Sequence, residues 1–265
     1  MSVRPYLSAF RTRFKLETRY IGAALGGLGC KLFFALILIA LYRALYAYRP
    51  QETPLQAIVA YVWLQQAGFR LLLAQDRDLL DTIRLGGMAY TLVRPVDQYS
   101  YWYARTLAQK IMGCLMRGIP MSLIAALLPT GWSLPAPAGL GAFLLFLCSL
   151  LLGALCVSAL DGISMGVTIR TLDARGILAL LNLLMVTMSG NLIPLSFFPD
   201  SWQAVLRFSP YTQLLDTPIR LYTGEFGPLQ ALPALLTQAG WLVLLIVLGR
   251  LIWRKNLRRV VVQGG

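Results

Sequence analysis

The chain has 265 residues, of which 57% are hydrophobic and only 13% are charged, and its mean hydropathy is +0.65. A soluble domain carries about 25% charged residues, so this composition excludes an ordinary soluble fold. The net charge of +13 does not indicate nucleic-acid binding, because the basic residues flank apolar blocks and no separate soluble domain is present. We therefore expect an integral membrane protein with no nucleic-acid partner.

Residues 1–20 are basic and precede a long apolar block. Leu7, Phe10 and Phe14 fall at helical spacing, with basic residues between them. The block that follows is too long for the hydrophobic region of a cleavable signal peptide. Residues 1–20 are therefore predicted to form an interfacial helix on the cytoplasmic leaflet, in contact with membrane lipids; the alternative is a basic topogenic leader with no further role.

Six apolar blocks follow, and each comes near the roughly 20 residues that a helix needs to cross the hydrocarbon. No alternating β-barrel pattern is present, so the predicted fold class is all-α. Polar residues interrupt the second and third blocks, which makes them the least regular. The predicted spans are residues 21–47, 55–74, 103–128, 140–160, 176–195 and 232–253.

The distribution of basic residues predicts the topology. The side that carries most of them is expected to be cytoplasmic, which places both termini there and agrees with an even number of spans. Trp102 and Trp253 are expected near the inner interface, and Trp132 and Trp202 near the outer one. The residues assigned to the inner side are Arg4, Arg11, Arg13, Lys15, Arg19, Arg77, Arg84, Arg94, Arg105, Lys110, Arg170, Arg175, Arg250, Arg254, Lys255, Arg258 and Arg259.

Residues 75–100, between the second and third spans, are the most polar part of the chain. Leu79, Leu80 and Ile83 predict a short helix with one apolar side, acidic residues near its N-terminus and a glycine pair at its end. Such a helix fits a groove on a partner, but a solvated loop explains the spacing equally well. The candidate residues are Asp76, Asp78, Asp81, Arg84, Gly86, Gly87, Arg94, Pro95 and Asp97.

The fifth apolar block ends in an unusual way. A plain helix terminus needs one stop signal, whereas Gly190, Pro194 and Pro199 follow one another here. The pattern predicts a short folded cap at the outer membrane surface, over residues 196–231. The candidate cap residues are Ser189, Gly190, Pro194, Phe197, Phe198 and Pro199.

The residue types present also limit the chemistry. There is no histidine, and Cys30, Cys114, Cys148 and Cys156 lie in predicted spans without a CxxC pair. We therefore predict no catalytic residue and no metal site, and we expect the cysteines to be buried apolar residues. No GxxxxGK[ST] loop occurs, so this chain is not expected to bind ATP in the P-loop manner.

Two motifs carry a resemblance to a known family. They are Gly86-Gly87-x-Ala89-Tyr90-x-Leu92-Val93-Arg94-Pro95-Val96-Asp97 and Ser189-Gly190-x-x-Ile193-Pro194-Leu195-x-Phe197-Phe198-Pro199, and a terminal Gln263-Gly264-Gly265 accompanies them. The chain thereby resembles the membrane component of ABC-2-type exporters, most nearly the six-span permeases encoded beside a second permease and a separate ATPase. It departs from that pattern at Asp161-Gly162-Ile163-Ser164, where relatives often carry a Phe-Trp pair between spans four and five.

The resemblance implies a permease subunit in the bacterial cytoplasmic (inner) membrane. ATP and Mg would be bound by a dimer of partner ATPase subunits, residues 75–100 would couple to them, and the outer cap would shape the exit. A second six-span permease would complete the pathway, by analogy as a heterodimer. The cargo is not predicted by any of these elements.

Charges within the spans cost about 3 kcal/mol each on insertion scales, so they usually face a cavity or a partner. Lys31 and Arg70 lie near cytoplasmic ends and are expected to snorkel. Arg117 lies deeper and is predicted to face the translocation path or to pair across a dimer interface.

Two other functions fit the sequence less well. An ion-driven secondary transporter usually carries acidic residues at mid-membrane. Here every Asp and Glu is expected at or beyond a membrane boundary, and no inverted repeat is visible. A lipid-modifying membrane enzyme is disfavoured by the lack of histidine and of an intramembrane acidic cluster. A self-contained secondary transporter stays the main alternative.

Overall fold

The computed structural model describes residues 3–19, 21–49, 53–73, 81–82, 87, 91–171, 175–191 and 194–258. These residues form helices and connecting segments and contain no strand, as the predicted fold class requires. The elements are α1 (Arg4–Thr18), α2 (Ile21–Tyr48), α3 (Leu55–Leu73), α6 (Gln98–Ala126), α7 (Leu140–Thr171), α8 (Arg175–Met188), the 3-10 helix η1 (Leu195–Phe197), α9 (Asp200–Leu206), α10 (Thr212–Thr223) and α11 (Pro228–Leu257).

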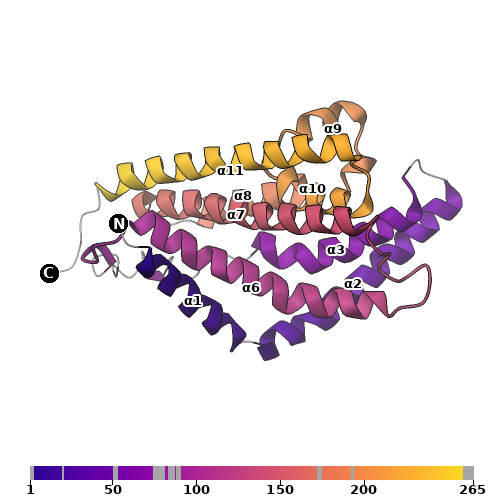
Figure 1. Ribbon diagram of the computed structural model, residues 1–265, viewed down its shortest axis with the longest axis horizontal. Helices are drawn as coiled ribbons and strands as arrows, with labels where there is room; N and C mark the ends of the chain where they lie inside the picture. Colours follow the sequence, from indigo (N-terminus) through magenta and orange to yellow (C-terminus); the bar gives the residue numbers. More distant parts are fainter. Residues whose placement is uncertain are drawn as a thin grey trace.

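The long helices run along one axis and form an elongated bundle (Figure 1). The short helices α9 and α10 gather at one end, and the start of α1 and the end of α11 lie at the other (Figure 1). Helix α1 packs along the first part of α6, while α7 packs against α10 and α11. The two ends of the bundle therefore carry different elements.

Helix α3 lies at the centre of the bundle, in contact with α2, α6, α7, α8 and α10. The stretch from Ile58 to Leu64 is buried on every side. Gln65, which interrupts the second apolar block, is only 3% exposed. A polar residue is tolerated here because it faces protein rather than lipid.

Within the described residues, three helical segments are long and apolar enough to cross a membrane: Gly26–Tyr48, Leu140–Thr171 and Leu229–Leu257. A shorter apolar helix covers Ala179–Met188. Helices α3 and α6 are not among them, and these are the two spans that the sequence shows to be interrupted by polar residues.

Helix α7 does not end at Leu160, where the predicted fourth span ends, but continues to Thr171. Its C-terminal half packs closely on α11, since a Cβ atom at Gly166 would lie 2.7 Å from the Trp253 ring. The Trp253 indole Nε1 donates to the Gly162 carbonyl at 2.6 Å. The lack of a side chain at Gly166 thus gives the Trp253 ring room to pack against α7 and to reach the Gly162 carbonyl one turn earlier.

The tryptophans differ from the aromatic belt expected at the inner interface. Trp102 and Trp253 are 3% and 1% exposed, so both are packed inside the bundle. Trp202, expected at the outer interface, is 62% exposed. At Gly162, where the sequence departs from the Phe-Trp pattern, two helices supply aromatic side chains: Tyr99 of α6 lies against the glycine, and Trp253 of α11 donates to its carbonyl.

Candidate functional site

The predicted coupling region is described only in part. Asp76, Asp78, Arg84 and Gly86 lie outside the described residues, so a helix over these positions stays a prediction. Asp81 is exposed and Gly87 is half-buried. The later part, from Thr91 onward, is described throughout.

Asp97 begins α6 as its N-cap, since its carboxylate accepts a hydrogen bond from the Ser100 amide at 2.9 Å. The Asp97 amide donates to the Tyr6 hydroxyl of α1 at 3.1 Å. Arg94 donates to the Tyr101 hydroxyl at 3.5 Å. Arg94, Pro95 and Asp97 are all exposed. The turn is thus fixed by α1 and α6 while its charged side chains stay accessible.

The predicted outer cap begins where α8 stops. Gly190 has φ +78°, and a Cβ atom there would collide with the Tyr61 hydroxyl of α3. That hydroxyl lies 3.0 Å from the Gly190 carbonyl oxygen and 3.1 Å from Asp216 Oδ1. Ser189 beside it is fully buried. Only glycine combines this backbone conformation with this close approach.

The two prolines of the motif each precede a short helix. Pro194 is buried and comes directly before η1, and the exposed Pro199 comes directly before α9. Phe197 stacks on Tyr42 of α2, with ring centroids 5.4 Å apart, whereas Phe198 is half-buried. The contact between Phe197 and Tyr42 therefore attaches this segment to α2.

Helix α10 lies deeper than a surface cap would, because most of its residues are buried against α7 and α3. Burial raises the pKa of Asp216 to about 6, although the Arg220 guanidinium, 3.9 Å away, lowers it. Arg220 also pairs with Glu225 at 2.8 Å. Gly224 ends the helix with φ +76°.

A second polar group holds α10 from the other side. The buried Gln238 of α11 donates from Nε2 to the Ser149 carbonyl at 2.8 Å and to the Gln213 carbonyl at 2.7 Å. The Ser149 hydroxyl donates in turn to Oε1 of Gln238 at 2.9 Å. One side chain thereby connects α7, α10 and α11.

Lys110 of α6 and Asp161 of α7 form a buried ion pair, with Nζ and Oδ2 2.8 Å apart and side chains 0% and 2% exposed. Asp161 lies about 15 Å along the helix from Thr171, at 1.5 Å per residue. The expectation that every acidic residue lies at or beyond a membrane boundary stays a prediction, while the structure shows that Asp161 faces Lys110 inside the bundle. Opposite charges in adjacent spans were the sequence signal for this pair.

Arg117 of α6 is half-buried. A position of Arg117 on a translocation path or at a dimer interface stays a prediction. The side chain of Arg70 lies outside the described residues.

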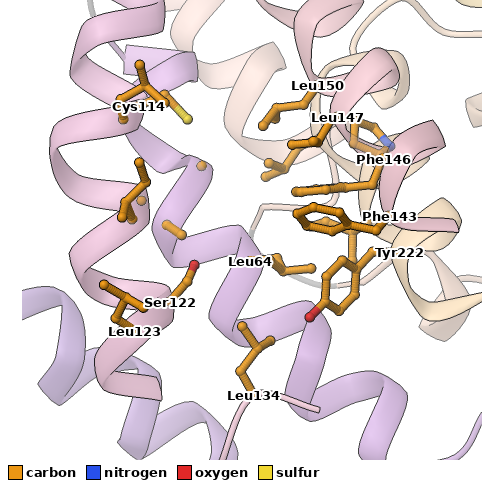
Figure 2. Close-up of a pocket in the computed structure, with 18 residues that line it drawn as sticks. Leu64, Cys114, Ser122, Leu123, Leu134, Phe143, Phe146, Leu147, Leu150 and Tyr222 are labelled. Carbon is orange, nitrogen blue, oxygen red and sulfur yellow. The ribbon is translucent and has the colours of Figure 1, made fainter. Parts of the chain in front are cut away.

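An apolar pocket of about 310 Å³ lies between the second half of α6 and the first half of α7. Figure 2 shows Cys114, Ser122 and Leu123 of α6 on one side and the aromatic and aliphatic side chains of α7 on the other. Leu64 of α3 and Tyr222 of α10 lie between them (Figure 2). No lining residue is charged, so this pocket suits an apolar group and offers no acid or base.

The comparison with protein families gives one match, to the model described as ABC-2 family transporter protein, over residues 56–264. No curated protein matches the chain. The matched region covers more than half of the chain and includes both motifs, the buried ion pair and α10. The chain therefore belongs to the ABC-2 family of transporter proteins.

Proposed function

We propose that this chain is one permease of an ATP-driven exporter in the bacterial inner membrane. It pairs with a second six-span permease, and a dimer of separate ATPase subunits binds ATP and Mg and contacts the inner face. The observation that carries the proposal is the family match, because the ABC-2 family is the membrane component of ABC transporters.

The six spans in this proposal are α2, α3, α6, α7, α8 and α11, with both termini in the cytoplasm. Helices α3 and α6 are about 28 and 43 Å long at 1.5 Å per residue, which is near or above the hydrocarbon thickness. Gln65, Gln109 and Lys110 are buried within the bundle. Polar residues directed at protein lower the mean hydropathy of a helix without exposing charge to lipid.

The coupling role is proposed for residues 75–100, with the charged side chains of Arg94 and Asp97 as contacts for the ATPase. This role is supported by the exposure of both side chains and by the hydrogen bonds that hold the turn at Asp97 against α1 and α6. A rigid, accessible turn at the end of a long helix transmits a push from a partner to the span.

The test is affinity purification of the chain from its native host in mild detergent, with identification of co-purifying chains and an ATP hydrolysis assay. The expected result is a stoichiometric ATPase subunit together with a second six-span chain. Purification of the chain alone, under conditions that keep known ABC complexes intact, would favour a self-contained secondary transporter instead.

A further inference from the structure

We propose that an anionic phospholipid binds by its phosphate group in a basic pocket between α1 and the start of α6. The pocket has a volume of about 320 Å³ and lies where α1 packs along α6 (Figure 1). This inference goes beyond the transport function, since binding needs neither the ATPase nor a second permease. It uses the proposed topology only to place the pocket on the cytoplasmic leaflet.

Three guanidinium groups line the pocket, from Arg13 of α1, Arg94 of the turn and Arg105 of α6, and none of the described residues that line it is acidic. Arginine is suited to phosphate because its planar donors bind two oxygens at once. Ser8, Thr12 and Tyr101 also line the pocket and add hydroxyl donors. The donor set therefore matches a phosphate group.

Two of the arginines are held in place by neighbouring side chains. Arg13 is 8% exposed, and its guanidinium lies 3.3 Å from the Glu17 carboxylate one turn away. The Arg105 guanidinium lies over the Trp102 ring, 4.8 Å from its centroid. Side chains ordered before binding lose less conformational entropy when a ligand arrives.

The pocket also has an apolar side, which favours a lipid over other anions. Pro5, Ala9, Leu16 and Val96 line it, and Leu7, on another face of α1, is 46% exposed. Exposed apolar residues on a basic helix are typical of a helix lying at the membrane surface. An acidic protein segment would satisfy the guanidinium groups but leave these side chains uncovered. Basic pockets beside spans on the cytoplasmic side are known to bind anionic headgroups.

The test uses the purified chain in a non-ionic detergent, titrated with dioctanoyl phosphatidylglycerol or dioctanoyl phosphatidylcholine in 0.3 M salt, with affinity read by thermophoresis. We expect the anionic lipid to bind about tenfold more tightly than the zwitterionic one. The pocket variant Arg13→Gln/Arg105→Gln should lose that preference. Arg13→Lys/Arg105→Lys, which keeps the charge, should retain it and reports on folding.

The matched control is Arg11→Gln/Lys15→Gln, which removes the same charge from exposed positions of α1 that do not line the pocket. Its affinity should change by less than about threefold, because salt screens exposed charges. Equal losses in the control and pocket variants, or equal affinity for both lipids, would overturn the proposal.

Two further arms identify the source of the anion. Glycerol phosphate should bind far more weakly than the anionic lipid; equal affinity would assign the site to a soluble phosphate and overturn the lipid assignment. If a glutamate-rich peptide binds instead, with the same loss in the pocket variant, the pocket is a docking site for an acidic protein segment and the proposal is wrong.

Discussion

At the scale of single residues, the ion pair between Lys110 and Asp161 is the most consequential contact. Both side chains are buried, so each depends on the other to offset the cost of removing its charge from water. A buried pair of this kind adds little net stability over a well-packed apolar pair, but the loss of one partner leaves an uncompensated charge. The pair therefore fixes which faces of α6 and α7 meet.

We predict that Lys110→Met and Asp161→Leu will each destabilise the protein by about 3–5 kcal/mol, because each leaves one buried charge unpaired. The double variant should recover most of that loss. The measurement is the midpoint of thermal denaturation in detergent, with the fraction of protein that stays folded after heating read by size-exclusion chromatography. A double variant no more stable than either single one would show that the two charges act independently.

Gly190 gives a second residue-scale prediction. Gly190→Ala should destabilise the protein by at least about 1–2 kcal/mol, the cost of a left-handed backbone for a residue with a Cβ atom, and the contact with Tyr61 adds to it. In a Tyr61→Phe background, the loss of stability caused by Gly190→Ala should be smaller, since the colliding hydroxyl is absent. Gly29→Ala, which meets no neighbour within 4 Å, is the control and should be neutral or stabilising. Equal effects at both glycines would contradict the prediction.

At the scale of helices, α10 is held by groups from three other elements. Tyr61 of α3 contacts Asp216, Gln238 of α11 donates to the Gln213 carbonyl, and Gly153 of α7 lets the Leu214 carbonyl approach closely. These attachments make α10 an internal helix of the bundle. Its stability depends on a buried carboxyl group whose pKa is raised.

We predict that Asp216 makes the protein less stable as the pH rises from about 4 to about 6. Because its pKa is raised to about 6 in the folded protein, the folded state holds this proton more tightly than the unfolded state does. Stability from this group is therefore present at low pH and is lost as the pH increases. Thermal denaturation of wild type and Asp216→Asn at pH 4, 5, 6 and 7 checks this.

The difference between the two proteins isolates Asp216 from the other carboxyl groups that titrate in the same range. The variant should gain stability relative to wild type as the pH rises. A constant difference across the four pH values would show that Asp216 does not titrate in this window.

The sequence predicted the helical class, the break at Gly190 and the N-terminal helix, because apolar blocks and glycine or proline signals act locally. It did not predict that α7 continues past Leu160. A charge ended the apolar block, and only the position of Lys110 on another helix makes Asp161 tolerable there. It also placed Trp253 at an interface, whereas the space for its ring is created by Gly166 of α7. Local patterns do not report which faces of distant helices meet.

At the scale of the whole molecule, the two ends of the bundle have different tasks in the proposed exporter. One end carries α9 and α10, held by buried polar contacts, and the other carries α1, the 91–97 turn and the end of α11 (Figure 1). Helices α6 and α7 run between the ends and are joined by the Lys110–Asp161 pair. A displacement of the turn would thus be carried along α6 to its partner α7.

The last prediction tests that transmission and separates a structural role of Asp97 from a coupling role. Asp97→Ala removes both the N-cap of α6, worth about 1 kcal/mol, and the charge. Asp97→Asn keeps a capping side chain and removes only the charge. In the assembled transporter, Asp97→Asn and Arg94→Gln should lower transport per ATP hydrolysed by about tenfold, because each removes a charged contact with the ATPase. Stability should stay near wild type in Asp97→Asn and fall only in Asp97→Ala.

Glu225→Gln, at the opposite end of the bundle, is the control for loss of a charge and should leave the amount transported per ATP hydrolysed unchanged. If Asp97→Asn transports normally while Asp97→Ala fails, the residue acts only as a helix cap, and the ATPase contact must be sought elsewhere in residues 75–100.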